Sequence, residues 1–141
     1  MRIAVASDHA GFDMKQILAT YLGELGHQVV DLGTDGPASV DYPDFGKALG
    51  EAVAGGQVER GVAVCGSVIG ISIAVNRIPG ARAAVCTDGL MAKLTRLHNN
   101  ANVLALGARL IGIETAKDCV DQFLATEYEG GRHDRRVEKL G

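Results

Sequence analysis

The sequence of 141 residues contains no tryptophan, and aromatic residues make up only 4% of it. We therefore do not expect the stacked aromatic surface that grips single-stranded nucleic acid. The formal net charge of −3 also argues against a nucleic-acid-binding protein, since such proteins are usually basic. No apolar run approaches the ~18 residues of a membrane helix, and no basic-then-apolar leader opens the chain. We expect a soluble, cytoplasmic protein with neither nucleic-acid nor membrane partners.

Cysteine is scarce, with Cys65, Cys86 and Cys119 as the three examples. The number is odd and no pair has the spacing Cys-x-x-Cys, which disfavours a disulfide framework, a zinc ribbon and a thioredoxin motif. Free thiols are typical of a reducing compartment, in agreement with a cytoplasmic protein.

Short apolar runs alternate along the chain with segments of helical periodicity. The length suits one domain, residues 1–141, and no repeat or internal boundary is evident. Because the apolar runs lack polar alternation, they predict parallel strands covered on both faces. We expect an α/β fold of the doubly wound, Rossmann-like type, with five strands at 3–6, 28–31, 61–65, 83–86 and 103–106. The charged tail, 127–141, is expected to form a helical arm that packs on another subunit.

Polar side chains cluster where the predicted strands end. In open α/β sheets, ligands bind outside the carboxyl ends of the strands. Reading only these ends predicts one rim that carries Ser7, Asp8, His9, Cys65, Gly66, Ser67, Thr87, Asp88, Gly107 and Arg109.

Cys65 lies where a strand turns into a glycine-bounded loop and then into a short helix, expected over 71–76. The backbone N–H groups there create positive potential, which favours a thiolate that could act as base or nucleophile. The alternative is a small buried residue ending a strand. The loop 66–70 lacks the P-loop lysine and the spacing Gly-x-Gly-x-x-Gly, and Ile71 stands where cysteine phosphatases need arginine. What remains is a loop that can point N–H groups at an oxyanion.

Histidine and arginine add further candidates outside that loop. His98 ends a helix, so it is either a proton shuttle or a partner of the helix dipole. Asp8 and His9 suit hydrogen bonding better than metal binding, because no further ligand has supporting spacing. Tyr42, before Pro43, is either a packed residue at a helix start or a ligand contact. The basic cluster Arg132, His133, Arg135 and Arg136 is either a solvated face or a phosphate grip.

Five groups of residues, in chain order, match one known pattern: Ser7-Asp8-His9-Ala10-Gly11, Asp41-Tyr42-Pro43, Cys65-Gly66-Ser67 with Gly70-Ile71-Ser72, Arg96-Leu97-His98-Asn99 with Asn102-Val103-Leu104, and Gly130-Gly131-Arg132-His133 with Arg136-Val137. In these segments the chain resembles type B ribose-5-phosphate isomerase, a family that includes the galactose-6-phosphate isomerase subunits. Any one segment is a weak signal, whereas all five at family spacing are highly specific.

The resemblance implies an aldose–ketose isomerase that interconverts ribose 5-phosphate and ribulose 5-phosphate through a cis-enediolate, without a metal or other cofactor. It implies catalytic roles for the proton-transferring base Cys65, the assisting hydroxyl of Ser67, and the ring-opening pair His98 and Asp8. It implies substrate contacts from His9, Tyr42, Gly66, Gly70, Asn99, Arg109, Arg132 and Arg136. It also implies a homodimer with the site shared between subunits, with assembly of two dimers into a tetramer left open.

Val68 departs from the family pattern, in which glycine is usual at this position. A β-branched residue strongly disfavours positive φ and would add bulk beside the anion hole. We expect either a backbone that valine tolerates or an altered loop, with activity reduced or redirected relative to a Val68→Gly variant.

Two other functions stay open from the sequence. One is isomerisation of a hexose 6-phosphate of the allose or galactose type, or of a rare free sugar, which residues 34–40 and Val68 would decide. The other is a non-catalytic phosphate- or nucleotide-binding protein on the same fold, which would have no need for Cys65 and His98 together.

Overall fold

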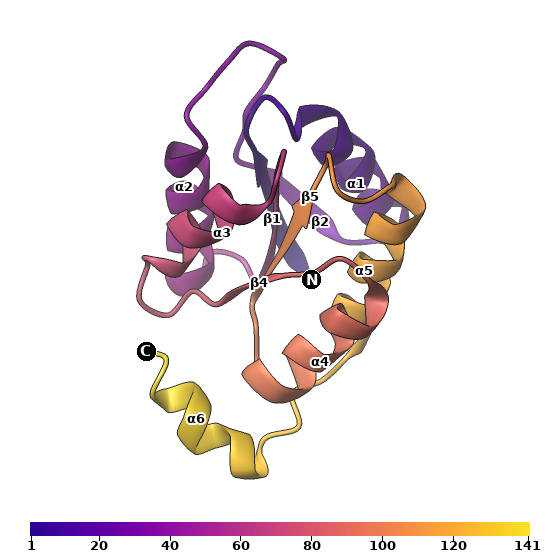
Figure 1. Cartoon of the computed structure of the whole chain (residues 1–141). Coiled ribbons are helices and arrows are strands. Elements are labelled where there is room, and N and C mark those ends of the chain that lie inside the picture. The colour runs from indigo at the N-terminus through magenta and orange to yellow at the C-terminus, as the bar shows by residue number, and fades with distance from the viewer.

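The computed structural model describes residues 1–141 and is built on one sheet of five parallel strands (Figure 1). The strands run in the spatial order β2-β1-β3-β5-β4. Their bounds are β1 Arg2–Ser7, β2 Gln28–Asp31, β3 Arg60–Cys65, β4 Ala83–Val85 and β5 Val103–Gly107. The predicted α/β class and the five-stranded parallel sheet are confirmed.

Helices cover both faces of the sheet, as the apolar strands predict. One face carries α1, α4 and α5, and the other carries α2 and α3 (Figure 1). The helices run α1 Phe12–Glu24, α2 Tyr42–Ala54, α3 Ile69–Asn76, α4 Gly89–Asn99, α5 Ile113–Ala125 and α6 Asp134–Glu138, with a 3-10 turn η1 at Gly131–His133 before α6. No helix has the length and apolar character to cross a membrane.

The three central strands explain the two cores. Every residue of β5 is buried, as are all but the first residues of β1 and β3. Because side chains alternate between faces, Val62 and Val64 pack under α1 and α5, whereas Ala63 and Cys65 face α2 and α3. Cys65 thus ends a strand that is immobilised on both sides.

Two element boundaries differ from the sequence prediction. The fourth strand ends at Val85 rather than Cys86, although the Cys86 N–H still donates to the Ala105 carbonyl. The short helix begins at Ile69, two residues earlier than predicted, because the loop before it turns sharply at Val68. Cys86 and Cys119 are core residues, as predicted, and burial raises their thiol pKa values to about 12 and about 11.

The C-terminal arm, residues 126–141, projects from the body of the protein beside α4 (Figure 1). A buried guanidinium fastens its base. Arg96 in α4 donates to the Thr126 carbonyl, to Asn100 Oδ1 and to the Ala101 carbonyl. Burial lowers the pKa of Arg96 to about 10, so the side chain remains charged at neutral pH. The arm therefore has a fixed origin next to the C-terminal end of α4.

Candidate functional site

A cavity of about 390 Å³ opens at the carboxyl ends of β1 and β3. The chain leaves β1 toward β2 on one side and leaves β3 toward β4 on the other, so this is the point where strand order reverses. Ligands of open α/β sheets bind in such crevices. The cavity is lined by Asp8, His9, Ala10, Tyr42, Cys65, Gly66, Ser67, Ile69, Gly70, Ile73 and Arg109.

The loop after β1 holds its two polar side chains by hydrogen bonds. Asp8 Oδ1 accepts from the Gly11 N–H at 3.0 Å. His9 Nδ1 accepts from the Val40 N–H at 3.2 Å, which leaves the hydrogen of a neutral imidazole on Nε2. His9 therefore offers a donor to the cavity while it anchors the loop before α2.

The loop after β3 presents a row of free backbone donors. None of the N–H groups from Gly66 to Gly70 donates a hydrogen bond within the chain. They lie between Cys65 and the first turn of α3, where the helix dipole adds positive potential. Cys65 is only 4% exposed, yet it lines the cavity. The loop can thus stabilise an oxyanion formed beside the thiol.

Arg109 brings a permanent positive charge to the same loop. Its N–H donates to the Gly66 carbonyl at 3.0 Å. A Cβ on Gly66 would lie 3.3 Å from the guanidinium carbon of Arg109, so the absence of a side chain there lets the guanidinium rest on the loop. The cavity therefore joins free N–H donors to a cation, a combination suited to an anionic ligand.

Val68 adopts the left-handed conformation that a β-branched residue disfavours, with φ at +66° and ψ at −19°. Its side chain is 1% exposed and packs in the core with Ile71 and Leu49. The expectation of added bulk beside the anion hole is wrong, because the side chain turns into the core and leaves the cavity lining free. The buried contacts hold a strained backbone in place.

The wall of the cavity on the α3 side includes residues that the sequence reasoning missed. Ile69 and Ile73 follow one another at helical spacing and are 61% and 56% exposed. Tyr42 packs across Gly70, where a Cβ would come within 2.5 Å of the ring. The signal for the two isoleucines was their spacing opposite the buried Ile71 and Val75. Within one chain, this wall is apolar and uncovered.

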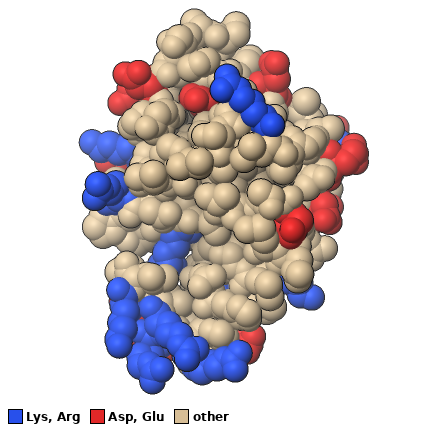
Figure 2. Space-filling view, viewed as in Figure 1, with Lys and Arg blue, Asp and Glu red and all other residues tan.

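Eight of the twelve predicted site residues line the cavity, and four do not. Asn99 lines a different cavity of about 360 Å³, together with Arg82 and Leu140. His98 lies at the end of α4, and Arg132 and Arg136 lie in the arm. Lys and Arg gather over the arm in Figure 2, which makes it the most basic part of the face shown. One chain thus carries two separate groups of the predicted residues.

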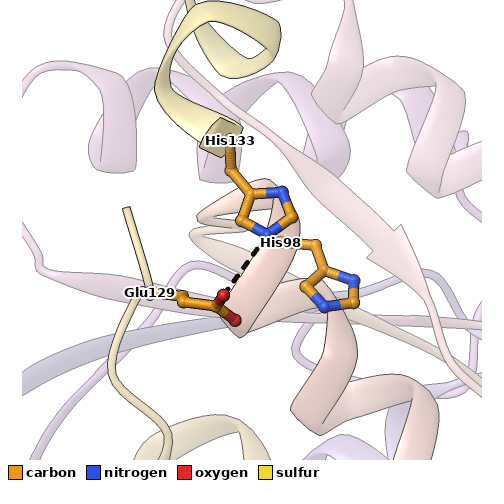
Figure 3. A group of neighbouring side chains, drawn as sticks. All are labelled: His98, Glu129 and His133. Atoms are coloured by element: carbon orange, nitrogen blue, oxygen red, sulfur yellow. Dashed lines mark ion pairs between the residues drawn. The ribbon is translucent and has the colours of Figure 1, made fainter. Parts of the chain in front are cut away.

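His98 belongs to a compact group with Glu129 and His133 (Figure 3). The two imidazole rings are stacked, with centroids 4.7 Å apart and planes inclined by 21°. Glu129 Oε1 lies 3.8 Å from His133 Nε2. These are residue types that bind zinc. However, Arg132 Nε lies 3.4 Å from the same Nε2, and its positive charge opposes a cation there. The group is therefore better suited to fixing the His98 imidazole than to binding a metal ion.

Comparison with known proteins gives one consistent result. The sequence profile described as ribose/galactose isomerase matches residues 3–140. The chain is 46% identical to ribose-5-phosphate isomerase B of Escherichia coli K12, covering 99% of this chain and 93% of that protein. It superposes on the ribose-5-phosphate isomerase B structure of Clostridium thermocellum with a TM-score of 0.99 at 51% identity, covering 100% and 95% of the two chains. The Mycoplasma genitalium enzyme with bound ribulose 5-phosphate gives 0.94 at 38% identity, covering 99% and 93%.

Proposed function

We propose, given that the chain belongs to the ribose/galactose isomerase family, that it interconverts ribose 5-phosphate and ribulose 5-phosphate at the Cys65 cavity. The row of free N–H groups beside Cys65 is the observation that carries this proposal. Isomerisation passes through an enediolate, whose negative oxygen requires donors beside the base that removes the proton.

The chemistry follows from these groups. The Cys65 thiolate removes the proton from C2 of the open-chain aldose, and the electron pair forms the C1–C2 double bond while O1 becomes negative. The N–H groups from Gly66 to Gly70, together with the Asn99 amide of a second protomer, stabilise that charge. The Ser67 hydroxyl moves a proton from O2 to O1, and the Cys65 thiol returns its proton to C1. The product is the ketose, the thiolate is regenerated, and no metal or other cofactor takes part.

The residues outside the cavity enter through a second chain. We propose a homodimer in which His98, Asn99, Arg132 and Arg136 of one protomer complete the cavity of the other. His98 and Asp8 then open the furanose ring, and the arginines grip the phosphate with His9 and Arg109. Each chain would otherwise leave its apolar cavity wall and its basic arm unused.

The surface of the chain supports this assembly. Large apolar side chains are exposed on α3, β4 and α4, and the face over these elements carries few charged residues in Figure 2. Exposed apolar patches of this kind mark protein interfaces. The side chains are Ile69, Ile73, Val85, Leu90, Met91 and Leu94.

A substrate panel with two variants tests the proposal. Purified protein is assayed with pentose and hexose phosphates and with free sugars, and ribose 5-phosphate is expected to give the highest kcat/KM. Cys65→Ala and His98→Ala should each lose nearly all activity, whereas Cys119→Ala, a buried cysteine outside the cavity, should retain it. Activity that survives both site substitutions would refute the mechanism.

A hexose 6-phosphate is the second candidate substrate, because the segment 34–40, expected to decide the preferred sugar, reaches the cavity residue His9 through the Val40 N–H. Preference for allose 6-phosphate or galactose 6-phosphate in the panel would favour it. We place the protein in the cytoplasm, because its three cysteines are free thiols, which are typical of a reducing compartment. We treat residues 1–141 as one domain, because both hydrophobic cores pack on the two faces of one sheet.

A further inference from the structure

His133 has no part in the proposed chemistry, yet it lies directly against the ring that opens the sugar. Its imidazole is only 6% exposed and stacks on His98 at a centroid distance of 4.7 Å (Figure 3). His98 itself is half-buried at the last turn of α4, where its side chain has no hydrogen-bond partner within the chain. A carboxylate oxygen of Glu129 lies within 4.8 Å of a His98 ring nitrogen, and the stacked His133 ring covers the face of the imidazole. The stacked ring is therefore a contact that limits where the His98 imidazole can point.

The backbone holds the two histidines in register. The Glu129 N–H donates to the Leu97 carbonyl, next to His98, and the His133 N–H donates to the Gly130 carbonyl. Arg96 fixes the start of the same segment through the Thr126 carbonyl. These bonds join the arm to the end of α4 just before His98. Hydrogen bonds therefore fix the backbone that carries each of the two stacked rings.

The chemistry of the stacked ring suits an aligning role. His133 Nε2 is occupied by neighbours of its own chain, with Arg132 Nε at 3.4 Å and Glu129 Oε1 at 3.8 Å. Its face, rather than its nitrogen, is turned to His98. A flat, buried ring restricts a second ring by contact area and by offset stacking, and it does so without exchanging a proton.

We propose that His133 is a positioning residue that holds the His98 imidazole in the orientation needed for ring opening. The proposal rests on the proposed function, because it takes the reaction at His98 as given. Aromatic pairs of this kind shift an equilibrium by about 2- to 10-fold beyond simple burial. Loss of the stack should therefore lower the fraction of productive His98 orientations by that factor.

Three variants separate stacking from other roles. His133→Ala removes the ring, His133→Asn keeps a polar group without a ring, and His133→Phe keeps a flat ring without the nitrogens. The matched control is His27→Ala, since the His27 ring hydrogen-bonds the amino terminus and is not part of the group formed by His98, Glu129 and His133. We expect kcat on ribose 5-phosphate to fall about 2- to 10-fold in the Ala and Asn variants with KM nearly constant, and to recover in the Phe variant.

Proton NMR provides a readout independent of activity. Ring current from His133 should displace the ring-proton resonances of His98, which are assigned by their absence in His98→Asn. They should move toward free-histidine positions in the Ala variant and stay displaced in the Phe variant. The proposal is overturned if the Phe variant is as slow as the Ala variant, or if KM rises while kcat holds. Inactive wild-type protein would instead refute the proposed function, and the NMR result would still decide the stacking.

Discussion

The backbone at Val68 gives a prediction that compares two glycine substitutions. At φ +66° a side chain costs about 1–2 kcal/mol relative to glycine. The comparison is between two variants, Val68→Ala and Val68→Gly. Because glycine avoids this cost, its free energy of unfolding should exceed that of the alanine variant by the same amount, less up to ~1 kcal/mol for the greater freedom of the unfolded glycine chain. Val68→Gly should therefore be as stable as Val68→Ala or slightly more stable, although it removes more of a buried side chain.

Val120 is the matched control, because it is equally buried but lies in the middle of α5. There glycine should be about 1 kcal/mol less stable than alanine. The difference between the two sites, roughly 1–2 kcal/mol, is the cost of the left-handed conformation.

Urea unfolding of the four variants, at one fixed protomer concentration, measures this difference. If Val68→Gly falls below Val68→Ala by as much as Val120→Gly falls below Val120→Ala, Val68 is not strained and the reasoning is wrong. The same Val68→Gly protein should differ from wild type in kcat/KM or in sugar preference. Equal values on ribose 5-phosphate would show that the backbone at position 68 does not influence the anion hole.

Three further predictions address stability and assembly. Lys15 is buried and pairs with the half-exposed Asp31 at 2.7 Å, so Asp31→Asn should destabilise by about 1.5–3 kcal/mol and by more than Lys15→Met; the reverse order in urea unfolding would contradict this. Burial raises the pKa values of Cys86 and Cys119 in the folded state above those in the unfolded chain. The two thiols therefore contribute their full stabilisation below about pH 9, and this contribution decreases as the pH rises further. A Cys86→Ala/Cys119→Ala protein should lose less stability than wild type between pH 8 and pH 10 in urea unfolding, and an equal loss would refute the assignment. Ile73→Asp should yield monomers in analytical ultracentrifugation with at least about tenfold lower kcat/KM, whereas an active dimer would remove Ile73 from the interface.

The sequence was sufficient for the sheet because its signals are local. Short unbroken apolar runs such as 103–106 favour strands covered on both faces, and glycines mark where several of them end. The same logic placed Asp8, His9 and Cys65 at one rim, because parallel strands end on one edge. These residues do line one cavity.

Features that depend on tertiary packing escaped the sequence. Nothing local shows that the Val68 side chain turns into the core, because that direction is set by the loop backbone and by Leu49 from α2. The stack of His98 on His133 joins residues 35 positions apart through the arm, so periodicity carries no trace of it. Ile69 and Ile73 lie in a mostly apolar segment, where only their spacing opposite Ile71 and Val75 distinguishes the exposed face from the buried one.

A mixing experiment tests the shared site most directly. Cys65→Ala and His98→Ala chains, each nearly inactive alone, are unfolded together and refolded at equal concentration. If each site takes Cys65 from one protomer and His98 from the other, half of the sites in a mixed dimer are intact, and about a quarter of wild-type activity should return on ribose 5-phosphate. Mixtures that form mixed dimers but stay as inactive as the separate variants would contradict the account.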